Sequence, residues 1–263
     1  MLKSRLQPSF FDDTARVVCW FSCGAASAVA AKWAVAKYGE RCVVVNCDTT
    51  EDEHPDNKRF RKDVEKWLGV EILEIRSTKY KNVDDVIEKT RYMSGVNGAI
   101  CTTQLKKVPR FDFQYFNDIH IFGYTNEKKE ERRAKNFEKT NFDLNIEWIL
   151  IENGLTKKMC FEILRLANIK RSEMYELGFD NANCIGCLKA QSPSYWNQTR
   201  KLFPFVFAKR VEQSRNLNVR LVKYKGKRIF LDELPMDADE DLHEEIDCGV
   251  LCQTETQDVS IKT

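Results

Sequence analysis

Apolar and polar positions divide the first half of the chain into short apolar runs separated by longer helix-compatible segments. Strands buried on both faces of a sheet have such uninterrupted runs, whereas strands with one solvent-exposed face alternate. The runs are therefore predicted to be buried strands of a parallel sheet. They cover residues 16–21 (RVVCWF), 42–47 (CVVVNC), 70–77 (VEILEIRS) and 118–125 (DIHIFGYT).

The segments that follow these runs are predicted to be helices, and a glycine such as Gly39 is a typical end signal. They cover residues 27–39, 58–69, 83–93 and 126–139. Alternating strands and helices are typical of an α/β fold with a doubly wound, Rossmann-like parallel sheet. Ligands of such sheets bind at the carboxyl ends of the strands. We expect the segments 22–27, 48–53 and 123–133 to lie there.

The pattern changes after about residue 150, where the alternation of strands and helices ends. We therefore expect a sheet domain at residues 14–150 and a smaller, helical and cysteine-containing subdomain at residues 151–263. The second part comprises a helix at 155–169 capped by Thr156, a loop at 180–192, an aromatic and basic segment at 195–215, and a hairpin at 220–234 that turns at Lys225-Gly226.

Composition fits a globular protein of near-neutral charge. The 263 residues are 43% hydrophobic and 31% charged, with a formal net charge of +2. This balance argues against a protein whose main role is to coat nucleic acid, although local basic patches remain compatible with it. No apolar run is long enough to span a membrane, and the first residues lack the apolar core of a signal peptide. We therefore expect a cytoplasmic protein, with no membrane partner and with its ten cysteines in a reducing compartment.

The segment Ser22-Cys23-Gly24-Ala25-Ala26-Ser27 joins the first predicted strand to the first predicted helix. Backbone N–H groups and the helix dipole favour an anion at such a helix N-terminus. Gly24 allows a ligand to approach the backbone, and the hydroxyls of Ser22 and Ser27 add donors. Ser27 is also a candidate cap of the helix. The alternative is a capped helix after a buried strand, with no ligand.

This loop resembles the PP-loop of the adenine-nucleotide α-hydrolase superfamily, and within it the loops of sulfonucleotide reductases. Ala26 stands where the ATP pyrophosphatases of the superfamily usually carry Asp. Four further segments are similar to motifs of the phosphoadenosine phosphosulfate (PAPS) reductase family and occur in the family's order. They are NCDTTEDEHPDNKRF (46–60), CTTQLKKVP (101–109), GYTNEKKEERR (123–133) and CIGC (184–187), so the resemblance covers roughly residues 15–205.

The resemblance implies an adenine nucleotide, which is PAPS, adenosine phosphosulfate (APS) or ATP, with Mg²⁺ as a further candidate ligand. The phosphate or sulfate end is expected on residues 22–27 and near Gly123, and the adenosine beside Asp48 and Thr49. Without the resemblance, residues 130–133 are better explained as an exposed helix with ion pairs between neighbouring turns. The cations expected to neutralise the nucleotide are Lys106, Arg132 and Arg133.

Five cysteines lie in loop-like segments, namely Cys101, Cys184, Cys187, Cys248 and Cys252. The resemblance to APS reductases implies that the first three bind a [4Fe–4S] cluster. Thr102 replaces a fourth cysteine ligand, unless Cys248 or Cys252 completes the set. A Cys₄ zinc site formed by the last four cysteines is the second interpretation. The third is that these thiols bind no metal.

The resemblance favours thiol-dependent reduction of a sulfonucleotide, with release of sulfite. Residues 247–250 (DCGV) loosely match the family motif that carries the nucleophilic cysteine, although Leu251 replaces its histidine. Cys248 would attack the sulfur, and a thioredoxin-like protein would supply the reducing thiols. The alternative is an ATP-dependent sulfurtransferase with an Fe–S cluster that adenylates tRNA or DNA for thiolation or phosphorothioation, and residues 195–215 leave room for such a substrate. A third hypothesis is a nucleotide-binding protein of the same fold without catalysis.

Overall fold

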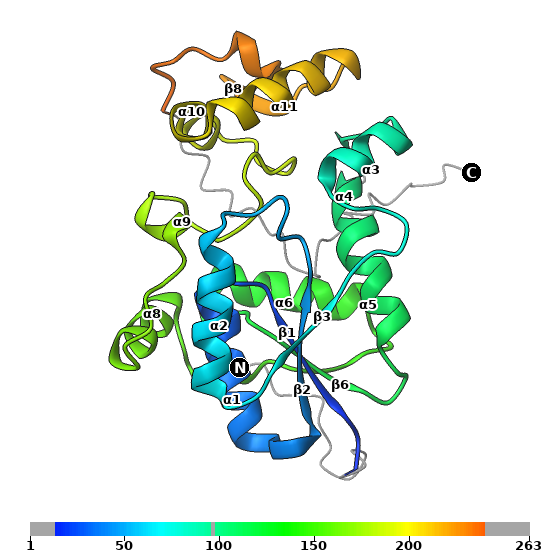
Figure 1. Ribbon diagram of the computed structural model, residues 1–263, viewed down its shortest axis with the longest axis vertical. Helices are drawn as coiled ribbons and strands as arrows, with labels where there is room; N and C mark the ends of the chain where they lie inside the picture. Colours follow the sequence, from blue (N-terminus) through cyan, green and yellow to red (C-terminus); the bar gives the residue numbers. More distant parts are fainter. Residues whose placement is uncertain (1–13, 96–97, 240–263) are drawn as a thin grey trace, which may run out of the picture.

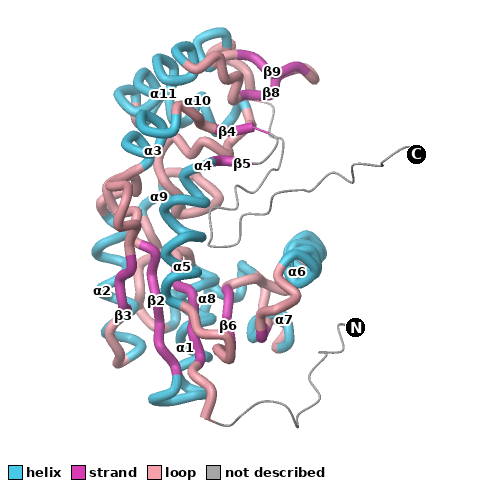
Figure 2. The backbone as a smooth tube through the Cα atoms, turned by 90° about the vertical axis from the view of Figure 1, so that its right-hand side faces the viewer, coloured by secondary structure: helices cyan, strands magenta, loops and turns pink. Residues whose placement is uncertain are grey.

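Five parallel strands form the central sheet in the order β3-β2-β1-β6-β7 (Figure 2). The computed structural model describes residues 14–95 and 98–239. β1 lies in the middle, with Val17 opposite both Cys42 of β2 and Ile119 of β6. The four predicted strands are confirmed, and a fifth, β7, was missed because it is short and lacks an apolar run. The bounds are β1 (Val17–Phe21), β2 (Cys42–Cys47), β3 (Ile72–Ile75), β6 (Ile119–Phe122) and β7 (Asn145–Glu147).

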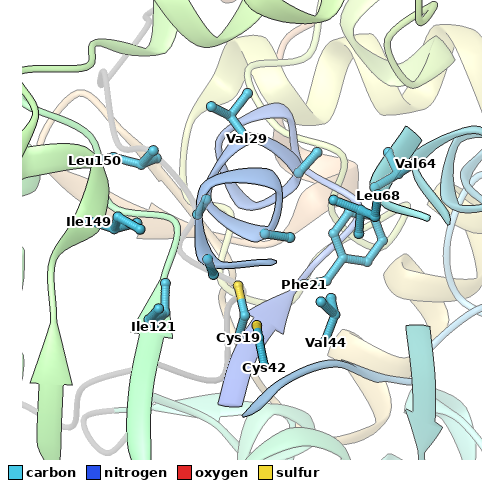
Figure 3. Packing of buried hydrophobic residues seen from close by; sticks show 14 of the residues in the cluster. Cys19, Phe21, Val29, Cys42, Val44, Val64, Leu68, Ile121, Ile149 and Leu150 are labelled. Atoms are coloured by element: carbon cyan, nitrogen blue, oxygen red, sulfur yellow. The ribbon is translucent and has the colours of Figure 1, made fainter. Parts of the chain in front are cut away.

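Helices cover both faces of the sheet, as in a doubly wound, Rossmann-like α/β fold. On one face Cys19 and Phe21 of β1 pack in a buried cluster with residues of α1, α2 and α7 (Figure 3). On the other face Trp20 and Phe122 pack with Phe137 of α6, because successive residues of a strand point to opposite sides. The bounds are α1 (Ala25–Tyr38), η1 (Gly39–Arg41), α2 (Asp56–Leu68), α5 (Val108–Phe113), α6 (Lys128–Thr140), α7 (Ile149–Glu152) and α8 (Lys157–Leu166).

A second large hydrophobic cluster lies at the end of the molecule where Figures 1 and 2 show α3, α10 and α11, beyond the carboxyl ends of β1 and β2. Trp196 is its largest fully buried side chain. The cluster combines residues from both sides of residue 150, the expected domain boundary. The division of the chain into two domains at that residue stays a prediction. The elements here are α3 (Val83–Thr90), β4 (Ser94–Gly95), β5 (Gly98–Ala99), α4 (Ile100–Thr102), α10 (Pro193–Leu202), α11 (Pro204–Asn216), β8 (Val222–Tyr224), β9 (Lys227–Ile229) and η3 (Leu231–Glu233).

Local sequence signals act as expected at two places in the second half of the chain. The Thr156 hydroxyl accepts a hydrogen bond from the amide of Met159 and so caps α8. The hairpin turns at Lys225 and Gly226, whose φ angles of 47° and 76° are those of a type I′ turn.

Cys101 differs from the expectation that it lies in a loop, since it lies in a helical stretch in which α4, η2 (Thr103–Lys107) and α5 follow one another without a break. Within the described residues, no helix has the length and apolar character needed to cross a membrane.

Candidate functional site

The strand order reverses between β1 and β6, in the middle of the sheet. From β1 the chain continues to β2 and β3 on one side, and it then crosses back to β6 and β7 on the other. Ligands of doubly wound sheets bind at the carboxyl ends of the strands at such a switch point. The predicted loop at residues 22–27 follows β1 at this point, and Gly123 follows β6.

Hydrogen bonds of Ser27 close the loop after β1. The Ser27 hydroxyl accepts hydrogen bonds from the amide and the hydroxyl of Ser22, at 3.1 and 3.2 Å, and donates to the carbonyl of Gly24 at 2.9 Å. Because α1 begins at Ala25, Ser27 lies inside the helix, and Gly24 is an N-cap without a side-chain hydrogen bond. The expectation that Ser27 caps α1 is therefore wrong. Ser27 instead fixes the shape of the loop, in which Cys23 adopts a left-handed φ of 57°.

Two backbone amides of this loop are available to a ligand. Among the described residues, none accepts a hydrogen bond from the amides of the half-buried Gly24 and Ala26. The first amides of a helix have no partner within it, and the dipole of the 14-residue α1 gives this end a partial positive charge. The loop therefore suits an anion such as phosphate or sulfate.

Gly123 is the point where the end of β6 touches the loop. A Cβ atom added to this glycine would lie 2.6 Å from the amide nitrogen of Ser27 and 2.7 Å from its Cα. Both atoms belong to the backbone of α1, so no side-chain rotation could relieve the contact. The predicted residue is thus at the site, but its glycine is required by packing between β6 and α1 whether or not a ligand binds.

Tyr175 reaches the loop from a distant part of the chain. Its hydroxyl, on α9 (Glu173–Glu176), accepts a hydrogen bond from the amide of Ala25 at 3.2 Å. Burial raises the pKa of Tyr175 to about 12, so the hydroxyl keeps its proton at neutral pH and can donate it to a ligand oxygen. Edge-on packing against Phe161 helps to hold the ring. Tyr175 was not predicted from the sequence, because 150 residues separate it from Ala25 and no local motif marks it.

Asp48 and Thr49 follow β2 at the same edge of the sheet, as predicted. The amide of Asp48 donates to the carbonyl of Ile75 at 2.8 Å, and its carboxylate pairs with the exposed Arg76 at 2.6 Å. The buried Thr49 hydroxyl donates to the carboxylate of Glu53 at 2.5 Å. This segment is therefore held in place by protein contacts before any adenosine binds.

Lys106 is a buried cation near the ends of β1 and β2. Only 7% of the residue is exposed. Burial raises the pKa values of Cys23 and Cys47, the latter to about 12, and the positive charge of Lys106 acts against both shifts. The thiol of Cys47 also donates a weak hydrogen bond to the carbonyl of Lys106 at 3.7 Å. The charge of Lys106 therefore acts at Cys23, inside the loop, and its contact with a nucleotide stays a prediction.

Arg132 and Arg133 lie near the start of α6, the helix that follows β6. Arg132 is exposed. Arg133 is half-buried, forms an ion pair with Glu130 one turn away, and has its guanidinium 5.2 Å from the ring of Tyr124. The pair with Glu130 matches the ligand-free explanation of residues 130–133. The roles of the two arginines in nucleotide binding stay predictions.

The loop of Cys184 and Cys187 is joined to the segment after β2. The amide of Ile185 donates to the carbonyl of Asp52 at 2.8 Å. Within the loop, the hydroxyl of Tyr195 accepts from the amide of Cys187 at 2.9 Å and donates to the carbonyl of Cys184 at 3.4 Å. Both cysteines are buried. The chain therefore brings this pair next to the segment expected to hold adenosine.

A complete metal site does not form from the described residues alone. Among them, no three His, Cys, Asp or Glu side chains are grouped so that they could hold one metal ion. Cys101 is buried in the same hydrophobic cluster as Leu188, the residue after Cys187. Cys248 and Cys252, the other predicted ligands, lie outside the described residues. The cluster and zinc hypotheses stay predictions.

The structure thus gathers the loop at residues 22–27, Gly123, Lys106 and the Asp48 segment at one edge of the sheet, and adds Tyr175. The chain matches no model of a known protein family, and no curated protein matches it in sequence. The interpretation of this edge therefore depends on its geometry and charges.

Proposed function

We propose that the protein binds an adenine nucleotide at this edge of the sheet and belongs to the PAPS reductase family. One observation carries the proposal: the amides of Gly24 and Ala26, which donate no hydrogen bond to any described residue, lie at the switch point between β1 and β6. Phosphate and sulfate groups bind such helix N-termini. Lys106 supplies positive charge and Tyr175 a hydroxyl donor, while Asp48 and Thr49 are proposed to face the adenosine.

The reaction we propose is reduction of a sulfonucleotide, with Cys248, outside the described residues, as the nucleophile. Its thiolate attacks the sulfur of the sulfo group, the S–O bond to the phosphate breaks, and the nucleotide leaves with the bonding electron pair. One thiol of a thioredoxin-type dithiol then attacks the S-sulfocysteine and releases sulfite. Its second thiol resolves the mixed disulfide, so the dithiol is oxidised and Cys248 returns to a thiol. Ala26, in place of the aspartate of ATP pyrophosphatases, supports this reaction over ATP cleavage.

The contribution of the loop to this reaction is electrostatic. As the S–O bond breaks, negative charge grows on the departing phosphate oxygen. The amides of Gly24 and Ala26 and the charge of Lys106 stabilise that charge, because they are already oriented before the reaction starts.

A second candidate is ATP-dependent transfer of sulfur to a nucleic acid. The contact between Ile185 and Asp52 favours it, because it brings two buried cysteines beside the segment proposed to hold adenosine. In this function ATP would adenylate tRNA or DNA and release pyrophosphate.

Nucleotide binding and turnover by the full-length, anaerobically purified protein distinguish these functions. We expect calorimetry to detect PAPS, APS or ATP at micromolar to millimolar concentration, and dithiol-dependent sulfite release from a sulfonucleotide. Pyrophosphate release that requires tRNA or DNA would replace reduction by the second candidate. Iron, zinc and sulfide analysis of the same sample tests the two metal hypotheses. Absence of binding by all three nucleotides would contradict the proposed function as a whole.

A further inference from the structure

A small pocket lies beside Cys184, formed entirely by residues between 174 and 198. Its volume is about 200 Å³. Clefts that enclose drug-sized ligands are roughly 300 to 1,000 Å³, so this pocket fits a single heterocycle rather than a whole nucleotide. None of its lining residues comes from the loops after β1, β2 or β6, and it borders the proposed nucleotide site only through Cys184, whose loop contacts Asp52.

The lining of the pocket is polar but almost uncharged. Its polar residues are Asn181, Asn183, Gln198, Ser192 and Ser194, and the hydroxyls of the two serines hydrogen-bond to each other at 2.5 Å. Asp180 is the one charged side chain among the lining residues, so nothing there would neutralise a phosphate or sulfate group. The rings of Phe179 and Tyr195, 5.4 Å apart and edge-to-face, complete the wall.

Two of the side-chain amides, those of Gln198 and Asn181, hydrogen-bond to the protein through one end, and among the described residues the other end has no partner. The side-chain nitrogen of Gln198 donates to the carbonyl of Leu177, which leaves the Gln198 side-chain oxygen as an acceptor. The side-chain oxygen of Asn181 accepts from Lys157 Nζ at 3.3 Å, which leaves the Asn181 NH₂ group as a donor.

Gly178 keeps the Gln198 amide in its position. A Cβ atom at this glycine would lie 2.9 Å from Gln198 Nε2, and its φ of 84° is one that other residues rarely adopt. The glycine thus lets the amide approach the backbone, and the hydrogen bond to Leu177 then fixes the side chain. The acceptor is positioned before a ligand arrives, which lowers the entropic cost of binding.

We propose that this pocket binds a nucleobase. A base is planar, uncharged and of suitable size, and its edge presents donors and acceptors next to one another, which asparagine and glutamine side chains pair with. Aromatic rings in the wall provide the apolar contact that such a ring needs. The base belongs either to a free nucleoside or nucleotide, or to a nucleic-acid strand.

The test measures binding of the four phosphate-free ribonucleosides by calorimetry, and of twelve-residue RNA and DNA homopolymers by fluorescence anisotropy, to the full chain. At least one base should bind, and Ser194→Phe, which fills the pocket, should weaken its binding at least tenfold. Lys201→Phe, the matched control at an exposed position of the same helix outside the pocket, should bind within about twofold of the wild type. Binding of the nucleosides alone identifies a free ligand as the source, and much tighter binding of a homopolymer identifies a strand.

Asn181→Leu is a second pocket variant: it removes the NH₂ donor and, unlike Ser194→Phe, leaves α10 unchanged. Circular dichroism checks that each variant folds. The proposal is overturned when neither nucleosides nor homopolymers bind the wild type, or when both pocket variants bind like the wild type. Gly24→Ala separates the two sites: it should weaken ATP or PAPS binding and leave nucleoside binding unchanged. Loss of nucleoside binding in that variant would assign the base to the loop after β1 instead. The pocket therefore stands or fails independently of the proposed function.

Discussion

Two glycines near the loop after β1 have different reasons to be glycine. Gly123 touches the backbone of Ser27, and a Cβ there would lie 2.6 Å from its amide nitrogen. Gly24 has an ordinary φ of −90°, and the nearest atom to an added Cβ, the Tyr175 hydroxyl oxygen, is 3.5 Å away. The first glycine is required by packing, whereas the second is required only if a ligand comes close to the backbone.

The pair Gly123→Ala and Gly24→Ala separates folding from ligand binding. Gly123→Ala should lower the free energy of unfolding by about 1–3 kcal/mol, the usual cost of forcing extra volume into a packed site. Gly24→Ala should unfold at nearly the wild-type urea concentration and yet bind nucleotide more weakly. Urea titration and calorimetry on both variants provide the measurement, and a Gly123→Ala variant as stable as the wild type would contradict the packing argument.

Tyr175→Phe tests the contact at Ala25. The phenylalanine keeps the ring packed on Phe161 but leaves the Ala25 amide without its acceptor, which should cost about 1–2 kcal/mol of unfolding free energy. Phosphate or sulfate should stabilise this variant less than the wild type, because the bound anion loses the hydroxyl donor of Tyr175. Urea unfolding with and without the anion measures both effects; equal stabilisation of the two proteins would show that the anion does not reach the Tyr175 hydroxyl.

At the scale of elements, Asp52 connects the segment after β2 to the cysteine loop and to α3. Its carbonyl accepts from Ile185 of the cysteine loop, and its carboxylate accepts from the amide of Val83 at the start of α3, at 2.9 Å. Burial raises the pKa of Asp52 to about 6, and the nearby carboxylates of Asp84 and Glu53 also raise it, whereas the hydrogen bond from Val83 and the charge of Arg210 lower it. The ionised side chain is therefore held in an unfavourable environment at neutral pH.

This environment has a definite consequence for stability as a function of pH. Because the folded-state pKa lies above the ordinary value of 3.8, the stabilising contribution of Asp52 is fully present below about pH 4 and is lost as the pH rises through 6. Asp52→Asn keeps an acceptor for Val83 but has no charge. Its stability relative to the wild type should increase by about 1–2 kcal/mol from about pH 4.5 to about pH 7.5. Urea unfolding at both values checks this, and a difference independent of pH would show that Asp52 titrates normally.

At the scale of the whole molecule, Arg210 joins α11 to parts of the chain far away in sequence. It is 3% exposed. Its guanidinium donates to the carbonyl of Gly186 at 3.1 Å and to the carboxylate of Asp84 on α3 at 2.5 Å. Burial raises the pKa of Asp84, but Arg210 and the hydrogen bonds from Lys209 and Gln213 outweigh it and lower the pKa to about 2. One buried side chain thus links α3, α11 and the cysteine loop.

Arg210→Ala should reduce the free energy of unfolding by about 3 kcal/mol, since it leaves a partly buried carboxylate without its main partner. Lys209→Ala is the matched control, because Lys209 pairs with the same carboxylate at 2.5 Å but is 54% exposed. It should cost less than about 1 kcal/mol. Urea unfolding compares the two, and similar losses would mean that burial of the arginine does not matter.

The sequence predicts the local parts of this molecule better than the long-range contacts. The strand at 17–21 was predictable because its residues are apolar on both faces, and the turn at Lys225-Gly226 because Gly226 tolerates positive φ. β7 was missed because two of its three residues are polar. The contacts of Tyr175 with Ala25 and of Ile185 with Asp52 depend on how distant segments pack, which no local pattern encodes. The position of Lys106 was predicted from the family resemblance alone.

The contact between Gly123 and Ser27 also limits how the sequence can change over time. A side chain at position 123 is acceptable only if the backbone at positions 26 and 27 moves first, and the loop cannot move without losing the amides that it presents. Substitutions at these three positions are therefore expected to depend on one another, so single-site libraries will find position 123 intolerant while paired libraries will not. Variation at Gly24, by contrast, should follow the ligand rather than the fold.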